Sequence, residues 1–356
     1  MPNRVWDTPR TFRASRREFL LAAATAAGAA ALLPARGLLV QAASLSPAPE
    51  NGLIDVHNHF MPPSVTQELG AKRLGVMANW TPERALADMD GAGVHTAMTS
   101  IAPAGDVLGD PSTAARLART CNEYAARLAA DYPGRFRVFA NVPMPNIEAT
   151  LRESEYALDT LKAYGIGLYT SYGDKWLGHA AFDPVFEELN RRKAVVYTHP
   201  QTANCCKNLI ANVGDGAIEW GTDTTRAIVE MIFGGAAARY PNVRMIWSHG
   251  GGTMPFLVER FTVMARFAQF APKFPQGFAA AASKFYYDTA QVSNPAAMSA
   301  LRKVIPISQI VFGTDYPFRT SAEHVKGLKE CGVFNARELK QIHRENALSL
   351  LPQLKS

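Results

Sequence analysis

Eight short apolar segments alternate with helical patterns between residues 52 and 350, and this alternation restricts the fold more than any other feature of the chain. The apolar segments predict strands at 53–57, 96–101, 136–141, 165–169, 194–198, 243–248, 284–288 and 309–312. Helices are expected at 81–92, 111–132, 147–163, 182–192, 254–267, 295–303, 320–330 and 336–350, with a further helix from a cap at Thr222 or Asp223 to about residue 238. Eight strand–helix pairs predict an α/β fold, a single (β/α)8 TIM barrel. A doubly wound parallel sheet is the alternative, but no G-x-G-x-x-G sequence begins any of the helices.

Ionisable residues follow several of the expected strands. They are His57 and His59 on the first strand, His199 on the fifth, His249 on the sixth and Asp315 on the eighth. A spacing of two residues places His57 and His59 on the same face of a strand. Because the active sites of such barrels lie at the carboxyl ends of the strands, we expect all five side chains to meet at one rim. The other histidines are expected to be surface or core residues without a site role: His95, His179, His324 and His343.

Three imidazoles and one carboxylate form a donor set that suits zinc, with manganese as the alternative. We expect one divalent metal ion, bound by His57, His59, His199 and Asp315. His249 precedes three glycines and an expected helix, a setting that better suits a general acid or base. Taken singly, His199 or His249 is equally well explained as a hydrogen-bonded barrel histidine. The five residues together favour a metal site.

The first 42 residues carry the features of an export signal. Arg16 and Arg17 precede an apolar, alanine-rich stretch at 19–33, and small residues near 40–42 suit a cleavage site. This pattern is similar to a twin-arginine signal, which implies export of a folded protein to the periplasm or the extracellular space. A basic amphipathic helix or a membrane anchor is the alternative, although the apolar stretch is short for a span. We therefore expect a signal peptide at 1–42, a linker at 43–51 and the barrel at 52–356, with no membrane span in the mature protein.

The formal charge of +6 gives little support for a nucleic-acid partner. Residues 1–42 contain six arginines, one aspartate and one glutamate, a net charge of +4 that leaves +2 for the rest of the chain. A surface that binds nucleic acid needs a larger basic excess. The four cysteines include no C-x-x-C pair, which excludes a zinc knuckle or a thioredoxin-like site.

Four motifs resemble those of the amidohydrolase superfamily: Ile54-Asp55-Val56-His57-Asn58-His59, Thr198-His199-Pro200, Ser248-His249-Gly250-Gly251-Gly252 and Phe312-Gly313-Thr314-Asp315-Tyr316-Pro317. Within the superfamily they resemble the decarboxylase branch typified by aminocarboxymuconate-semialdehyde decarboxylase, to which the 6-methylsalicylate and γ-resorcylate decarboxylases also belong. The resemblance covers the chain from about residue 52 to 350.

The resemblance implies specific roles. The four expected metal ligands match those of the family, and His249 matches its catalytic histidine. Arg260 matches an arginine that reaches the substrate carboxylate of the neighbouring subunit, which implies a homodimer. The end of the fourth strand, at 165–169, holds no lysine for the bridging carbamate of binuclear members, which favours one metal. Ala85 stands where the muconate enzyme has an arginine, with Arg84 one position away, and this argues against a muconate substrate. The segments 199–206 and 220–223 look most similar to those of the 6-methylsalicylate decarboxylases.

The implied activity is non-oxidative decarboxylation of a small aromatic carboxylic acid of the 2-hydroxybenzoate type, such as 6-methylsalicylate. Loss of CO2 requires a proton on a ring carbon, and a protonated Asp315 and His249 both remain candidates for its donor. Phe60, Trp220 and Phe318 are candidates to sandwich the ring, with a core position as the alternative for each. A metal-dependent hydrolase of a lactone, ester or amide is the second function class. A non-catalytic metal-dependent binding protein is the third, and the additional His249 argues against it.

Overall fold

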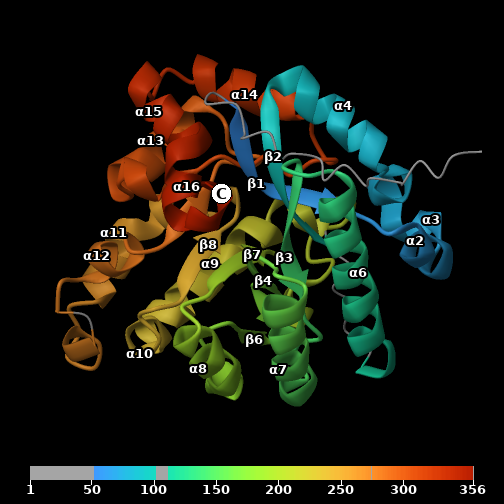
Figure 1. The fold of residues 1–356 in the computed structure, drawn as a ribbon. Helices are drawn as coiled ribbons and strands as arrows, with labels where there is room; N and C mark the ends of the chain where they lie inside the picture. Colours follow the sequence, from blue (N-terminus) through green and yellow to red (C-terminus); the bar gives the residue numbers. More distant parts are fainter. Residues whose placement is uncertain (1–51, 102–110, 274, 356) are drawn as a thin grey trace, which may run out of the picture. The chain divides into compact units, whose positions relative to one another are not determined.

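The computed structural model describes residues 52–101, 111–273 and 275–355, and it confirms the (β/α)8 barrel (Figure 1). Eight parallel strands follow one another around the sheet: β1 (Leu53–Phe60), β2 (Val94–Ile101), β3 (Phe136–Asn141), β4 (Gly165–Tyr169), β7 (Val195–His199), β8 (Arg244–Trp247), β9 (Tyr286–Asp288) and β10 (Ile310–Val311). The two remaining strands, β5 (Ser171–Tyr172) and β6 (Lys175–Trp176), form a separate antiparallel hairpin. The expected signal peptide and linker lie outside the described residues.

The chain closes the barrel beyond the end of its last strand. Although β10 holds only two residues, the amide of Val56 donates to the Phe312 carbonyl at 2.9 Å. The amide of Asp315 donates to the His57 carbonyl at 2.7 Å, and that of His59 donates to the Tyr316 carbonyl at 2.9 Å. The segment after β10 therefore lies along β1, and this closure brings Asp315 next to His57.

Helices surround the strands in sequence order: α2 (Pro63–Leu69), α3 (Ala71–Leu74), α4 (Pro82–Ala92), α6 (Pro111–Asp131), α7 (Ile147–Glu155), α8 (Asp183–Arg191), α9 (Glu219–Phe233), α10 (Ala236–Arg239), α11 (Met254–Met264), α12 (Phe278–Ala282), α13 (Pro295–Val304), α14 (Ser321–Glu330), α15 (Ala336–Lys340) and α16 (Asn346–Leu350). Local sequence explains where several of them begin and end. Thr81 caps α4 by accepting a hydrogen bond from the Arg84 amide, and Gly93 ends it in the left-handed conformation. Within the described residues, no helix combines the length and the apolar character needed to cross a membrane.

The start of α9 corrects the sequence analysis. The helix begins at Glu219, so that neither Thr222 nor Asp223 is its cap. Asp223 instead lies inside the helix, fully buried, and accepts hydrogen bonds from the hydroxyls of Thr170 and Ser171 and from the Trp176 indole. A buried carboxylate needs such donors, and these three tie α9 to the β5–β6 hairpin.

A register shift in β1 sets the direction of its side chains. Ile54 and Val56 pack in an apolar cluster inside the barrel, together with Phe139 and Tyr197. Strict alternation would then turn His57 away from the interior. The pairing of β1 with β2 shifts between Asp55 and Asn58, which is the irregularity of a β-bulge. Because of the bulge, the side chains of Ile54 and Val56 and those of His57 and His59 can all face the interior of the barrel.

Candidate metal centre

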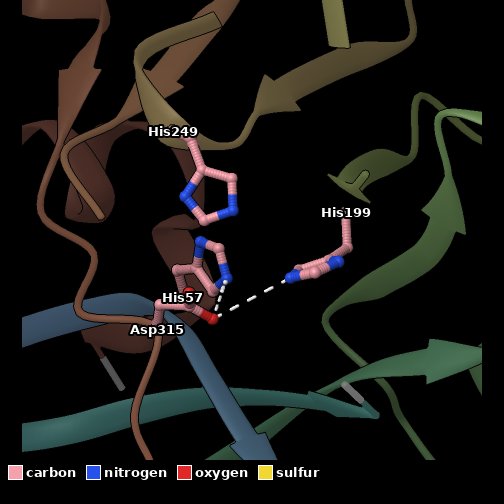
Figure 2. Close-up of side chains that lie close together, drawn as sticks. All are labelled: His57, His199, His249 and Asp315. Carbon is pink, nitrogen blue, oxygen red and sulfur yellow. Dashed lines mark ion pairs between the residues drawn. The ribbon is translucent and has the colours of Figure 1, made fainter. Parts of the chain in front are cut away.

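Four side chains meet at the carboxyl ends of the strands: His57, His199, His249 and Asp315 (Figure 2). Each offers one nitrogen or oxygen atom, and these atoms all lie within 4.8 Å of one another. All four residues are buried. His59 joins them, because its Nε2 lies 2.9 Å from Asp315 Oδ1 and 3.1 Å from His57 Nε2. The structure therefore brings together all five residues that the sequence placed at this rim. The group whose ligand atoms all lie within 4.8 Å of one another includes His249, which was expected as an acid or base, and does not include His59, which was expected as a ligand.

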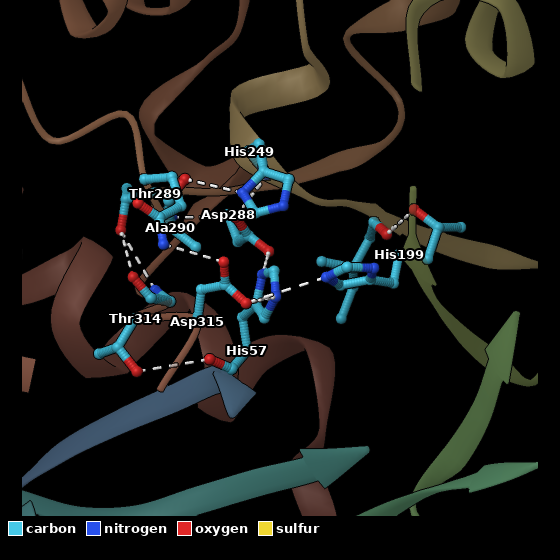
Figure 3. Close-up of polar contacts among 12 residues, drawn as sticks. His57, His199, His249, Asp288, Thr289, Ala290, Thr314 and Asp315 are labelled. Atoms are coloured by element: carbon cyan, nitrogen blue, oxygen red, sulfur yellow. Dashed lines mark hydrogen bonds and ion pairs between the residues drawn. The ribbon is translucent and has the colours of Figure 1, made fainter. Parts of the chain in front are cut away.

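The imidazoles are held from outside the cluster through their Nδ1 atoms. The contacts are His57 with Asp288 Oδ2 at 2.7 Å, His59 with Ser100 Oγ at 3.2 Å, His199 with the Pro200 carbonyl at 2.8 Å and His249 with the Ala290 carbonyl at 3.1 Å. A carbonyl or carboxylate acceptor requires a proton on Nδ1, so that Nε2 is the nitrogen available to a metal ion when the ring is neutral. Figure 3 shows Asp288 between His57 and His249. The buried Nε2 atoms of His199 and His249 have no hydrogen-bond partner.

Asp315 presents its two oxygens to different partners. Oδ1 faces the imidazoles, at 3.1 Å from His57 Nε2 and 2.9 Å from His59 Nε2. Oδ2 accepts a hydrogen bond from Gln291 Nε2 at 3.0 Å. Asp315 and His249 both adopt a positive φ, of 62° and 53°. Such backbone conformations are uncommon for non-glycine residues and persist where the surroundings hold them, as at binding sites.

Burial and charge set the protonation of the cluster. Burial lowers the pKa of His199 and of His249 to about 4, so that both imidazoles are neutral at pH 7. Burial opposes ionisation of Asp315, but the facing histidines, His57 first, hold its pKa well below the usual range. Burial also opposes charge on His57, but Asp288 and Asp315 outweigh it and raise the pKa to about 10. A metal cation bound at His57 Nε2 would replace the second proton of the imidazole, which the negative charges of Asp288 and Asp315 otherwise stabilise.

These residues fit a divalent metal ion. The unpaired, buried Nε2 atom of His199 is costly unless it binds something, and imidazoles with one ionised carboxylate are the ligands that zinc and manganese accept. The hydrogen-bond partner of each Nδ1 adds the orienting contact that metal-binding histidines usually have.

Two of the three expected aromatic residues border the cluster. The Trp220 ring lies 5.7 Å from the His199 ring, and the Phe318 ring lies 5.9 Å from the His59 ring, both edge to face. Phe60 is placed elsewhere than expected. Its side chain is fully buried and stacks on Tyr124 at 6.0 Å, because it follows His59 and therefore points to the helix side of β1. Phe60 is thus a core residue in this structure.

Arg260 lies on α11, and its side chain is exposed. Arg260 is not a member of the metal cluster, whose four residues are all buried. Its expected contact with a neighbouring subunit stays a prediction.

Several supporting residues escaped the sequence analysis. Asp288 carried a usable signal, since it ends an expected strand at the same rim. Asp55 is fully buried and accepts hydrogen bonds from the amide and the hydroxyl of Thr314, at 3.1 and 2.6 Å, which fixes the residue before Asp315. His324, expected to have no site role, is fully buried and accepts the backbone amide of Gln291. No sequence signal pointed to that contact.

Comparisons with known proteins agree with this architecture. A model of the Amidohydrolase family matches residues 54–353. Decarboxylase yanB of Aspergillus niger is 37% identical over 321 residues, which cover 84% of this chain and 87% of that protein. The 6-methylsalicylic acid decarboxylase of Penicillium expansum is 35% identical over 322 residues, which cover 85% of this chain and 97% of that protein.

A solved structure shows the same fold. The dihydroxybenzoic acid decarboxylase of Polaromonas sp., crystallised with manganese and the inhibitor 2-nitroresorcinol, superposes with a TM-score of 0.72 at 21% identity. The superposition covers 85% of this chain and 97% of that one. The family model spans most of the chain, the two relatives exceed 30% identity, and the motifs at the strand ends form one buried cluster. The chain therefore belongs to the Amidohydrolase family.

Proposed function

We propose that this protein is a metal-dependent, non-oxidative decarboxylase of a small aromatic carboxylic acid of the 2-hydroxybenzoate type, such as 6-methylsalicylate. The observation that carries the proposal is the buried cluster of histidines and Asp315 with Trp220 and Phe318 on its borders. Two relatives along most of the chain bear the name decarboxylase, and one of them acts on 6-methylsalicylic acid.

The residues divide the work as follows. A divalent cation held by His57, His59, His199 and Asp315 would supply a Lewis acid that binds anionic oxygens and stabilises developing charge. Trp220 and Phe318 contact the faces or edges of the ring, where aromatic groups interact favourably. The carboxylate leaves as CO2 when the bond to its ring carbon breaks, and the electron pair of that bond is taken up by a proton at the same carbon.

We assign that proton to His249. Its Nδ1–H is bonded to the Ala290 carbonyl, and its Nε2 faces the cluster without a partner. A proton on Nε2 therefore leaves the outer hydrogen bond intact. Asp315 is less suited, because one oxygen faces the imidazoles and the other accepts from Gln291. A substrate carboxylate next to His249 would oppose the effect of burial, which lowers the pKa of the imidazole to about 4.

The activity is tested by CO2 release from metal-loaded protein supplied with 6-methylsalicylate. We expect one CO2 and one decarboxylated arene for each acid consumed. The isomer with its hydroxyl para to the carboxylate is the matched control, because it cannot bind the metal through adjacent oxygens, and it should react far more slowly. Absence of CO2 from a panel of 2-hydroxybenzoates, with metal content confirmed, would reject the proposal and direct the search to lactones and esters.

We propose a single divalent cation, zinc or manganese. Imidazoles and one carboxylate suit both ions, and the related Polaromonas structure contains manganese. Metal analysis of protein purified without added metal, followed by reloading of stripped protein with each ion, decides between them.

We also propose a homodimer in which Arg260 serves the neighbouring active site. On α11, Phe256, Arg260, Val263 and Met264 are all exposed, and helical spacing places them on neighbouring turns of one face. Phe256 is 84% exposed, which is costly for a phenyl ring unless another surface covers it.

Mixing two inactive variants tests this arrangement. Hybrid dimers of Arg260→Ala and His249→Ala subunits contain one site with both residues intact. We expect recovery of activity in about one quarter of the sites after random mixing. No recovery, or a monomer by sedimentation, contradicts the proposal.

Export by the twin-arginine route is proposed from Arg16, Arg17 and the apolar stretch that follows. Replacement of both arginines by lysine should retain the protein in the cytoplasm of the host, whereas the unaltered chain should be recovered from the periplasm or the medium.

A further inference from the structure

Gln291 and His324 connect the metal centre to an outer helix. Gln291 lies three residues beyond the end of β9, and its side-chain amide donates to Asp315 Oδ2 at 3.0 Å. Its backbone amide donates to His324 Nε2 at 2.9 Å. His324 lies on α14 and is fully buried. Gln291 therefore links His324, in the outer helix layer, to the carboxylate of Asp315, which faces the histidines.

The hydrogen bonds define the tautomer of His324. Its Nδ1 lies 3.1 Å from the Thr320 carbonyl, which is an acceptor only, so this nitrogen carries the proton. Nε2 is then the free base that accepts from the Gln291 amide. Thr320 is itself fixed, because it forms a capping box with Glu323 at the start of α14. Gln291 therefore donates to Asp315 through its side chain and to His324 through its backbone, and His324 donates in turn to the Thr320 carbonyl.

The backbone of Gln291 depends on this support. Its φ is 61°, in the left-handed region that non-glycine residues rarely adopt. Its amide donates to a side chain from a distant segment, so no strand or helix holds this backbone in place. Loss of the His324 acceptor would free the backbone to relax, and the side-chain amide would then leave Asp315 Oδ2.

We propose that Gln291 is a positioning residue that keeps Asp315 a one-oxygen ligand, and that His324 holds Gln291 in the required conformation. The hydrogen bond to Oδ2 leaves Oδ1 alone directed at the imidazoles. Without the Gln291 donor, the carboxylate is free to turn and offer both oxygens to a metal ion. A second coordinating oxygen would compete with substrate oxygens for the metal ion. This inference rests on the metal site of the proposed function.

The test uses the full chain loaded with Co²⁺, whose visible absorption weakens as its coordination number rises. Gln291→Met removes the donor with little change in size. We expect weaker Co²⁺ absorption, about tenfold weaker metal binding and a higher KM for the aromatic acid, with a smaller effect on kcat. Gln309→Met is the matched control, because the Gln309 side-chain amide is also a donor, but to the backbone carbonyls of Ser283 and Lys284 and not to Asp315. Its spectrum should equal that of the unaltered protein.

His324 variants provide an independent arm that remains informative if Gln291→Met does not fold. His324→Leu removes the acceptor and should reproduce the spectral change. His324→Gln places an amide oxygen near the position of Nε2 and should restore the spectrum towards normal. A structural role without influence on Asp315 would lower the melting temperature of both variants and leave the Co²⁺ spectrum unchanged.

Two failures are distinguishable. Normal Co²⁺ uptake and an identical spectrum in Gln291→Met and His324→Leu reject the positioning role and leave the proposed function standing. Failure of the unaltered protein to bind Co²⁺ rejects the metal site, and with it both proposals.

Discussion

The Nδ1 atom of His57 lies 2.7 Å from Oδ2 of Asp288, and both residues are fully buried. The other oxygen of Asp288 accepts the backbone amide of His249 at 2.8 Å. One carboxylate therefore orients the central imidazole of the cluster and also fixes the backbone that carries His249. A contact of this kind sets which nitrogen of the imidazole faces a metal ion.

Replacement of Asp288 should weaken metal binding. In Asp288→Asn one side of the carboxylate becomes a donor, which opposes the Nδ1–H of His57 or the amide of His249. We expect a 10- to 100-fold loss of affinity, measured by competition with a chelating indicator. Asp90→Asn, which alters an exposed carboxylate paired with Arg135 on the outside of the barrel, is the control and should bind metal normally. Equal affinity in both variants would show that Asp288 does not orient the site.

His57 and His249 should respond differently to removal. His57→Ala deletes the imidazole that faces Asp315 at 3.1 Å, and we expect it to lose both metal and activity. His249→Ala should retain metal, because His59 and His199 remain, but lose turnover. Metal-to-protein ratios measured by elemental analysis separate the two effects. Loss of metal from His249→Ala, with retention in His59→Ala, would instead make His249 a ligand in place of His59.

The aromatic residues should separate into two groups. Trp220→Ala and Phe318→Ala remove rings that border the histidines, and each should raise KM for an aromatic acid about two- to tenfold, in line with the strength of ring–ring contacts. Phe60→Leu changes a core residue and should lower the melting temperature without a comparable change in KM. Steady-state kinetics and thermal unfolding on the same samples provide the comparison. A raised KM in Phe60→Leu at unchanged stability would show that Phe60 contacts the substrate.

His343 should make the fold sensitive to acid. Burial lowers its pKa to about 4, and its ring lies edge to face with Phe312 at 5.2 Å. The unfolded state takes up a proton near pH 6.5 and the folded state only near pH 4, so the contribution to stability is complete above pH 6.5 and is lost as the pH falls through this window. The loss has a limiting slope of about 1.4 kcal/mol per pH unit.

Urea unfolding at pH 7.5 and 4.5 measures this contribution. In His343→Phe the decrease in the free energy of unfolding between the two values should be smaller than in the unaltered protein. The same variant leaves the metal cluster untouched, so the acid response of His199 and His249 cancels in the comparison. An identical decrease in both proteins would assign the acid sensitivity to other groups.

The order of apolar and helical segments is enough to predict the barrel and the residues at its rim. Alternating apolar and helical patterns define the order of strands and helices, and residues at strand ends must meet because parallel strands share one carboxyl edge. For this reason His57, His199, His249 and Asp315 were found from local patterns alone.

The contacts between distant segments depend on the tertiary structure. A periodic pattern shows which side chains share a face of their own element, but it does not show which neighbour that face meets. Phe60 therefore packs on the helix side of β1, and Asp223 accepts a hydrogen bond from Ser171 of the β5–β6 hairpin. His324 accepts the backbone amide of Gln291. Closure of the barrel brought Asp315 against His57 across almost the whole length of the domain, because the backbone after β10 pairs with β1.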